Sequence, residues 1–368
     1  MKIHFKPSDK AFFKELNEKV KETLSSEVLS KNQRLMKVKF FLYFTLYLIF
    51  YGLLFLDVVS NNFLLLIITY SLFGLSGILL AFNSSHDAVH NTLFKRKKLN
   101  SIAHYLIFNL QGVNATLWKK RHISSHHIFP NVDGCDADID NNPFIRLSKT
   151  HARKWNHRYQ HLYAPFLYCA YTLHWILIKD FMYLYKKEVA NMKNLSYSWL
   201  FILEVILLKV LYLSFILLAP CYFSDLSLSN WIIAFIIMHS IISIFFVLTL
   251  IISHLTTETN FPIPDNRGML PTCYHEHQLS VSLDYHPTSK FANWIFGGFN
   301  SHAAHHLFPN LPHTLYTDIT PIIKETAMQF SMPYNELSII KAVKSHFQYL
   351  KELGNKCPSG RFESVDVH

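Results

Sequence analysis

Charged residues are scarce in this chain, at 16% of its 368 residues, whereas a soluble domain has about 25%. The 10 glycines and 14 prolines are few and scattered, which excludes a collagen-like or linker-rich chain. The five cysteines are an odd number without a CxxC pair, so we expect no disulfide framework and a reducing compartment. Apolar residues make up 50% of the chain, which excludes disorder and indicates a surface that contacts something other than water. The unusual number is 22 histidines.

Four apolar stretches are candidates for membrane spans, because a bilayer core needs about 20 apolar residues in a helix. They are Phe40–Leu56, Phe63–Phe82, Leu200–Ala219 and Trp231–Ser253. Two further apolar stretches, Ile102–Trp118 and Leu162–Ile178, are interrupted by histidine and amide residues, and we expect interfacial or core helices there. If only one of these two crossed the membrane, the later half of the chain would change sides.

The distribution of lysine and arginine predicts the topology. Residues 1–37, 83–199 and 253–368 hold nine, sixteen and eight of them, and the short connections 57–62 and 220–230 hold none. By the positive-inside rule the long segments face the cytoplasm, so the net charge of +10 does not require a nucleic-acid partner. The first 37 residues are charged and amphipathic, so we expect no signal peptide.

These observations predict an all-α integral membrane protein with four transmembrane helices in two hairpins and a cytoplasmic helical cap. We expect both termini in the cytoplasm and a bacterial inner membrane as the location. The expected parts are an N-terminal amphipathic segment, a first hairpin, a segment at the membrane surface, a second hairpin and the cap, at residues 1–37, 38–82, 83–199, 200–253 and 254–368.

Three short strings concentrate the histidines: HDAVH at 86–90, HISSHH at 122–127 and HAAHH at 302–306. On a helix, positions i, i+3 and i+4 project from one face, so each string is expected to point two or three imidazoles the same way. In the four-span topology all three strings lie on one side of the membrane, as a single site requires. The eight histidines are His86, His90, His122, His126, His127, His302, His305 and His306.

Eight imidazoles are too many for one ion, so the strings predict two metals with about four nitrogen ligands each. Imidazole suits zinc, copper, iron or nickel, and the ligand set alone does not choose among them. A pair of redox metals above an apolar membrane domain is suited to activating dioxygen against a C–H bond. Asn300 or Ser301 is expected to cap the helix of the third string. Carboxylates that could accept the second ring N–H of a ligand are Asp87, Asp136, Asp138, Asp140 and Glu258.

The three strings, in the contexts HDAVH, WKKRHISSHHIFPNVDGCDADID and GGFNSHAAHHLFPNLP, resemble the histidine boxes of the membrane fatty acid desaturases. The resemblance is closest to the bacterial acyl-lipid and linoleoyl-CoA desaturase-like branch and extends over nearly the whole chain. It implies a four-span fold, two iron ions, and the use of dioxygen and two electrons to remove two hydrogens from an acyl chain. The substrate would be an acyl lipid, an acyl-CoA or an acyl-carrier conjugate.

The resemblance also assigns residues. It makes the eight box histidines iron ligands and His254 a ninth ligand, and it places His277 and Gln278 near them. His302 stands where many front-end desaturases have glutamine, which puts front-end regiochemistry in doubt. The chain has no HPGG haem motif, so the electrons are expected from a separate ferredoxin or b-type cytochrome with its reductase.

Other residues are assigned from their positions in the predicted spans and cap. Trp118 and Trp294 flank two boxes and are candidates for a substrate tunnel, with interfacial anchoring as the alternative. For His239, in mid-span, we expect a hydrogen bond between helices. Lys209 is expected to pair with Glu204. Two C-terminal helices, at 318–331 and 335–353, are expected to pack in the cap, and electron-donor docking is the alternative role of Lys341, Lys344 and Lys351.

Three other functions compete with desaturation. The first is another oxidation on the same fold, by a hydroxylase, an acetylenase or a carotenoid ketolase. The second is a membrane metallohydrolase with one zinc, which would use about three histidines and leave five without a role. The third is a metal carrier, which should place its ligands along a path within the spans, where only His239 is deep.

Overall fold

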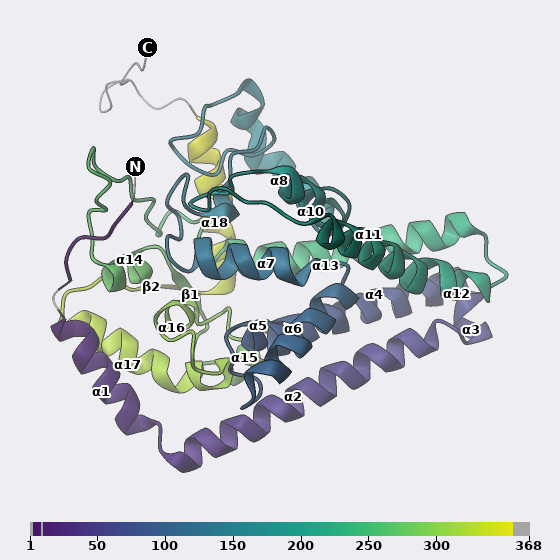
Figure 1. The fold of residues 1–368 in the computed structure, drawn as a ribbon, viewed down its shortest axis with the longest axis horizontal. Coiled ribbons are helices and arrows are strands. Elements are labelled where there is room, and N and C mark those ends of the chain that lie inside the picture. The colour runs from purple at the N-terminus through teal and green to yellow at the C-terminus, as the bar shows by residue number, and fades with distance from the viewer. Residues whose placement is uncertain (1–2, 9, 356–368) are drawn as a thin grey trace.

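The computed structural model describes residues 3–8 and 10–355 as a mostly helical protein with one pair of short strands. Long apolar helices extend toward one end of the molecule, and helices from the first and last parts of the chain gather with both strands at the other end (Figure 1). The helices are α1 (Ala11–Thr23), α2 (Ser26–Leu53), α3 (Asp57–Ser60), α4 (Phe63–Leu80), α5 (His86–Val89), α6 (Lys97–Leu110), α7 (Ala115–Arg121), α8 (Gln160–Cys169), α9 (Tyr171–His174), α10 (Asp180–Tyr185), α11 (Trp199–Leu213), α12 (Ala219–Tyr222), α13 (Leu228–Ile251), α14 (Tyr274–Ser280), α15 (Lys290–Phe296), α16 (His302–Leu307), α17 (Tyr316–Gln329) and α18 (Ile339–Gly354). The strands are β1 (Leu283–Tyr285) and β2 (Asn335–Leu337), and single π-helical turns lie at Ala81–Ser85, His122–His126, Trp175–Lys179 and Ser214–Leu218.

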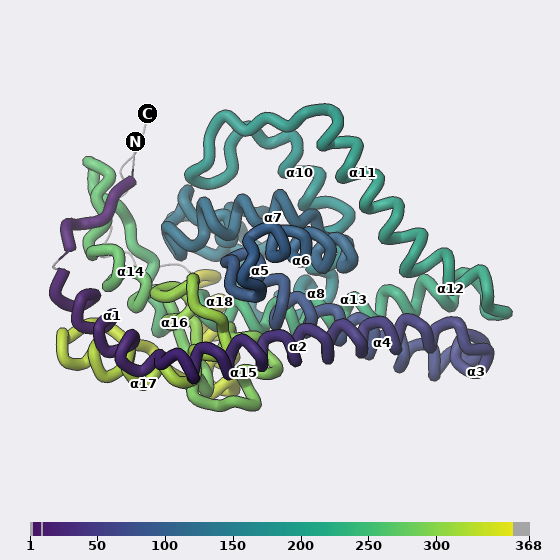
Figure 2. Tube along the Cα trace, turned by 60° about the horizontal axis from the view of Figure 1, so that its bottom comes forward, coloured from purple at the N-terminus to yellow at the C-terminus, as the bar shows by residue number. Residues whose placement is uncertain are grey.

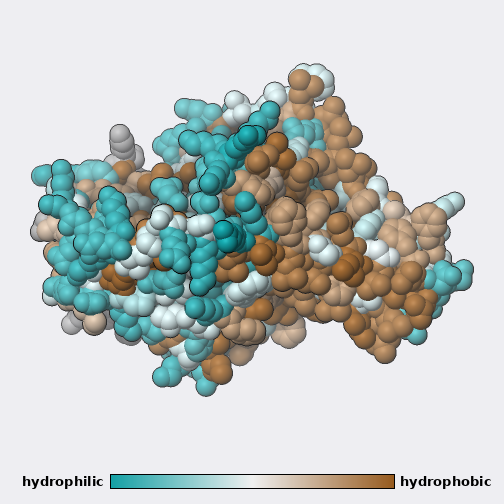
Figure 3. Space-filling model, turned by 90° about the horizontal axis from the view of Figure 1, so that it is seen from below, coloured by the Kyte–Doolittle hydropathy of each residue, from teal (hydrophilic) through white to brown (hydrophobic). Residues whose placement is uncertain are grey.

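Four continuous helical segments are long and apolar enough to cross a membrane, as the sequence predicts: Ser26–Leu53, Phe63–Val89, Trp199–Tyr222 and Leu228–Ile251. Large apolar side chains on these helices face outward, with Phe41, Leu64 and Leu211 exposed by 61%, 65% and 61%. On the face shown in Figure 3, hydrophobic surface covers most of one half of the molecule and hydrophilic surface most of the other. Such a band is expected where the solvent is lipid.

The first of these helices begins earlier than the apolar stretch that starts at Phe40. Ser25 caps it by accepting a hydrogen bond from the amide of Val28, and the helix then runs unbroken from Ser26 to Leu53. The expected division between residues 37 and 38 is therefore not an element boundary. The charged first turns extend the helix beyond the apolar stretch because a serine cap, not the change in polarity, sets its start.

The core of the long-helix half lies between α4 and its neighbours. Helix α4 packs against both α2 and α13. In the most apolar 18 residues of Phe63–Val89, which contains α4, half of the residues are buried, compared with 22% in the corresponding parts of Ser26–Leu53 and Trp199–Tyr222. Trp231, Tyr70 and Met238 are among the buried residues of this core. Helix α11 reaches the core mainly near α12 and diverges from the other long helices toward its start (Figure 2).

The two ambiguous stretches form short helices and are not among the four long apolar helices. Ile102–Trp118 contributes to α6 and α7, with a turn at Gly112 between them, where φ is +76°. Leu162–Ile178 contributes to α8, α9 and a π-helical turn, and α8 packs against α13 and α18. Both stretches pack partly against the core and leave large apolar side chains exposed, Leu106 by 54% and Phe166 by 77%.

Residues 254–355, which were predicted to lie in the cap, pack with α1 around the third histidine string. Helix α1 packs against α17, and its buried Phe12, Leu16 and Val20 join one apolar cluster with residues of α16 and α17. Strands β1 and β2 pair in parallel, with Leu283 opposite Asn335. The second C-terminal helix therefore begins at Ile339 and not near residue 335, because residues 335–337 are used as a strand.

The sequence predicted hydrogen-bond or ion-pair partners for two polar side chains on the long helices, and the structure confirms the prediction for one of them. His239 makes the expected hydrogen bonds between helices, since its Nδ1 lies 2.8 Å from Thr172 Oγ1 and its Nε2 lies 2.9 Å from Tyr212 Oη. The predicted pairing of Lys209 with Glu204 is wrong. Lys209 binds the buried carboxylate of Asp180, and Glu204 accepts from Tyr105 Oη at 2.6 Å.

Candidate metal centre

The first histidine string lies where α4 ends. A π-helical turn at Ala81–Ser85 continues the helix into α5, which carries His86, and His90 follows directly after Val89. The third string forms α16, with His302, His305 and His306 all buried. Both strings project their histidines from helical backbone, as expected.

The second string has a different local structure from the expected α-helix. Helix α7 ends at Arg121, and His122–His126 form a π-helical turn closed by the hydrogen bond from the His127 amide to the His122 carbonyl at 3.0 Å. In HISSHH the last histidine follows the first by five residues, so the wider turn brings both to one face. The Nε2 atoms of His122 and His127 consequently lie 3.0 Å apart. Single π-helical turns of this kind are frequent at functional sites.

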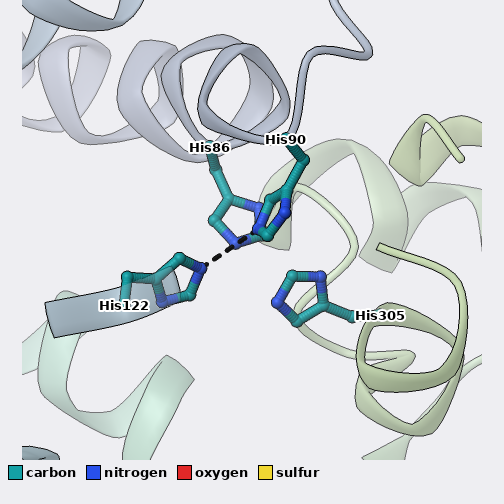
Figure 4. A group of neighbouring side chains, drawn as sticks. All are labelled: His86, His90, His122 and His305. Carbon is teal, nitrogen blue, oxygen red and sulfur yellow. Dashed lines mark hydrogen bonds between the residues drawn. The ribbon is translucent and has the colours of Figure 1, made fainter. Parts of the chain in front are cut away.

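One group of four histidines combines all three strings: His86, His90, His122 and His305. One ring nitrogen of each lies within 4.8 Å of those of the others. The rings converge from separate segments of the chain, with His90 Nε2 3.2 Å from His122 Nε2 (Figure 4). Three of the four side chains are buried and His90 is half-buried.

A second group of four combines histidines of the second and third strings with His254: His126, His254, His302 and His306. His254 Nε2 lies 2.6 Å from His302 Nε2 and 3.3 Å from His306 Nε2, and all four side chains are buried. His127 belongs to neither group of four. Its ring lies between them, with centroids 4.5 Å from His305 and 4.9 Å from His306.

The chemistry of these nitrogens fits metal ions. Burial lowers the pKa of His122, His302 and His305 well below the ordinary value, so the rings are neutral and carry lone pairs. The buried Nε2 atoms of His86 and His305 have no hydrogen-bond partner among the described residues. Two imidazole nitrogens that face one another at about 3 Å repel where both carry lone pairs, and a metal ion between them turns the repulsion into binding. Metal binding requires this neutral form.

In two histidines of the second group, Nδ1, the ring nitrogen that points away from the other histidines, is held by a hydrogen bond. His126 Nδ1 lies 3.2 and 3.3 Å from the carboxylate oxygens of Asp136, and His254 Nδ1 donates to the Val281 carbonyl at 2.9 Å. Each bond places the hydrogen on Nδ1 and leaves Nε2 free for a metal. Burial alone would lower the pKa of His126, but the negative charge of Asp136 raises it to about 9. Without a metal this ring therefore carries a second hydrogen on Nε2 at neutral pH, which a bound metal would displace.

The predicted supporting carboxylates occupy different places. Asp136 contacts His126, and Asp138 lies 3.6 Å from the same nitrogen. Asp87 binds the backbone amide and Nδ1 of His313 instead of a ring of either group. Among the described residues, Asp140 accepts from Lys186 Nζ and Glu258 accepts from Ser345 Oγ.

The remaining predicted residues lie around the centre. The Trp118 ring stacks on His122 at 4.4 Å, whereas Trp294 lies under the ammonium group of Lys39, 5.0 Å away. His277 packs edge-on against Phe5 at 5.3 Å, and Gln278 Nε2 donates to the His127 carbonyl at 3.3 Å.

Several residues of the centre were missed in the sequence. Asp284 caps α16 by accepting from the Ala303 amide at 2.9 Å, while the expected cap, the Ser301 side chain, donates to the Pro287 carbonyl. Asn131 Nδ2 donates to the His254 carbonyl at 2.9 Å. The repeated HHxFPN after the second and third boxes was a signal for Asn131, whereas no local pattern marks Asp284.

Comparison with known proteins agrees with this geometry. The family model for fatty acid desaturases matches residues 60–338. An acyl-lipid (8-3)-desaturase of Physcomitrium patens is 28% identical over 73% of this chain, which spans 56% of that protein's length. An sn-1 linoleoyl-lipid 6-desaturase of Arthrospira platensis is 27% identical over 80% of this chain and 79% of the relative's length. The acyl-lipid (8-3)-desaturase B of Dictyostelium discoideum is also 27% identical, over 88% of this chain and 70% of the relative's length.

The matched region begins before α4 and ends after α17, and so contains all nine histidines of the centre. The sequence resemblance, the four long apolar helices and the two histidine groups point to the same conclusion. This chain belongs to the fatty acid desaturase family, a family of oxidoreductases.

Proposed function

We propose that this protein is a dioxygen-dependent desaturase that introduces a double bond into the acyl chain of a lipid, with two iron ions held by nine histidines. The observation that carries the proposal is the pair of buried four-histidine groups next to four long apolar helices. Family membership supports iron and dioxygen over the one-zinc hydrolase and the metal carrier. When bound, the two irons would activate dioxygen, which with two electrons and two protons takes two hydrogens from the acyl chain and yields two waters.

The chain's own residues bind and orient the metals and exclude water. One iron would be held by His86, His90, His122 and His305, and the other by His126, His254, His302 and His306, with His127 between them. Asp136 and Val281 fix the tautomers of His126 and His254. Burial of the groups keeps bulk water from the oxidising site.

We propose that the acyl chain lies between the long helices and the cap, with Trp118 and Trp294 along its path. Trp118 supports this because it stacks directly on His122 and also contacts the long-helix core. The relatives from Physcomitrium and Arthrospira are named for acyl-lipid and linoleoyl-lipid substrates, which favours an acyl lipid over an acyl-CoA or acyl-carrier conjugate.

The proposed arrangement in the membrane is two hairpins, with the cap and both termini in the cytoplasm of a bacterial cell. The lysine and arginine distribution supports this orientation. Electrons would come from a separate ferredoxin or b-type cytochrome on the cytoplasmic side. Lys341, Lys344 and Lys351 are exposed on α18 and stay candidates for its docking.

A hydroxylase, acetylenase or ketolase on the same fold is the alternative, because the outcome depends on how the substrate carbon is placed. The test is the fatty-acid profile of a host that expresses the protein with a compatible electron donor, measured by gas chromatography–mass spectrometry. His126→Ala removes a ligand, and His174→Ala is the matched control because His174 is exposed outside both groups.

A product two mass units lighter than its precursor, absent with His126→Ala and present with His174→Ala, is the expected result. Derivatisation of the product then locates the double bond. A product sixteen units heavier would replace desaturation by hydroxylation at an intact site. An unchanged profile with the protein present in membranes would contradict action on the acyl chains of that host.

A further inference from the structure

A buried chain of three polar side chains lies beside the first histidine group. Lys39 Nζ is 2.6 Å from His313 Nε2, and His313 Nδ1 is 2.6 Å from Asp87 Oδ2. The backbone amide of His313 donates to the other Asp87 oxygen at 2.9 Å. All three side chains are buried, with exposed fractions of 0%, 1% and 3%. Neither Lys39 nor His313 belongs to a metal group, so the proposed function leaves them unused.

The bonding pattern orients the His313 ring. Asp87 accepts from Nδ1, so His313 carries a hydrogen there and its Nε2 faces the Lys39 amino group. Lys39 also donates to the Asn293 carbonyl at 3.2 Å. The Asp87 carboxylate and the Lys39 amino group are thus joined through one imidazole, so each of these buried polar groups has a partner.

The three hydrogen-bonded side chains come from distant parts of the sequence and meet beside the first histidine group. Lys39 comes from α2, Asp87 stands next to His86 in α5, and His313 follows the third box. Tyr316, one turn after His313, places its hydroxyl 3.5 Å from His305 Nδ1. His86 comes from the first box and His305 from the third, so these contacts would hold two of the four histidines of that group in place.

The second group has separate supports. Its histidines are held by Asp136 and by the Val281 carbonyl, and Asn131 binds the His254 backbone. Lys39, His313 and Asp87 make none of these contacts. Substitutions that break the hydrogen bonds among these three side chains should therefore disturb the first histidine group more than the second.

We propose that Lys39, His313 and Asp87 form a positioning relay that is selective for the first histidine group. The relay acts through α5 and Tyr316, and it ties helix α2 to the metal that His86, His90, His122 and His305 would hold. The inference rests on the proposed two-metal function, and it adds Lys39 and His313, which lie outside the histidine boxes.

The test measures iron bound per chain after anaerobic reconstitution of the purified protein with Fe2+, by inductively coupled plasma mass spectrometry. His313→Leu breaks the relay. His313→Gln keeps it, because a glutamine carbonyl can accept from Lys39 while its amide donates to Asp87. His239→Leu is the matched control, since His239 is equally buried and hydrogen-bonded on both nitrogens but lies outside both groups.

We expect about two irons per chain in the wild type, in His313→Gln and in His239→Leu, and about one in His313→Leu, from a 10–100-fold loss of affinity at one group. His302→Ala removes a ligand of the second group, so His313→Leu combined with His302→Ala should bind almost no iron. Lys39→Met should weaken the binding of one iron in the same way if His313→Leu does not fold.

Two irons retained in both His313→Leu and Lys39→Met would overturn the relay. So would an equal loss at both groups, or a loss in His313→Gln equal to that in His313→Leu. A wild type that never binds two irons would instead contradict the proposed function, so the two failures are distinguishable.

Discussion

At the scale of single residues, Asp136 is the group on which His126 most depends. Its carboxylate holds His126 Nδ1 and also accepts from the amides of Asn131 and Asp138, both at 2.9 Å. Asp136→Asn removes the charge that keeps the hydrogen on Nδ1. We predict a loss of metal affinity of about 10–100-fold at the second group only, measured by Fe2+ titration.

Asp133→Asn is the control for Asp136→Asn. Asp133 lies in the same loop, but its carboxylate binds His151 and Thr150 instead of a histidine of either group. Its variant should bind both irons with unchanged affinity. Equal losses in the two variants would mean that the loop, and not the Asp136–His126 contact, determines affinity.

Asp284 makes stability depend on pH. Burial raises its pKa from 3.8 to about 7 in the folded protein. Below about pH 4 both the folded and the unfolded chain hold this proton, and between pH 4 and 7 only the folded chain retains it, so stability falls as the pH rises through that window. Relative to Asp284→Asn, the wild-type Tm should drop by about 5 °C between pH 5 and pH 8 in thermal unfolding in detergent. A constant difference between the two proteins would contradict the prediction.

At the scale of elements, α1 is a structural part of the cap. Leu16 is fully buried among residues of α16 and α17. Leu16→Ala should lower the free energy of unfolding by about 2–5 kcal/mol, because it leaves a cavity behind the third box. Glu18→Ala, on the exposed face of the same helix, should be nearly neutral, and a comparable loss of Tm in both variants would place α1 outside the core.

The elements that the sequence predicted well are those with strong local patterns. The four apolar helices and the three boxes follow from runs of apolar residues and from histidine spacing. The π-helical turn at His122–His126 escaped prediction because periodicity assumes α-helical geometry, although the five-residue spacing was visible. The β1–β2 pairing and the early start of α2 depend on tertiary contacts and on one serine cap.

The site residues divide in the same way. The histidines were found because they recur in tight strings, and Asp136 because it follows the second box closely. His313 and Lys39 lie far apart in the sequence, and only the packing of α2 against the cap brings them to Asp87. Proximity along the chain also selected Asp140 and Glu258, whose side chains bind Lys186 and Ser345.

At the scale of the whole molecule, the proposed orientation can be tested by labelling. Asn61→Cys and Asp225→Cys place a thiol in the exposed turns between the long helices, and Lys97→Cys and Glu325→Cys place one on the histidine side. A membrane-impermeant maleimide should label the first two on the outer face of spheroplasts and the last two only after permeabilisation. The reverse pattern would invert the topology, and the histidine centre would then face outward.

The most direct test of the two-metal account is the metal content of the protein purified from cells grown with iron. Mass spectrometry of metals and quantitative amino-acid analysis give the number of ions per chain. The nine converging histidines predict about two irons, and about one in His302→Ala, which keeps the first group intact. A single zinc ion that survives in His302→Ala, with no iron in either protein, would contradict the account.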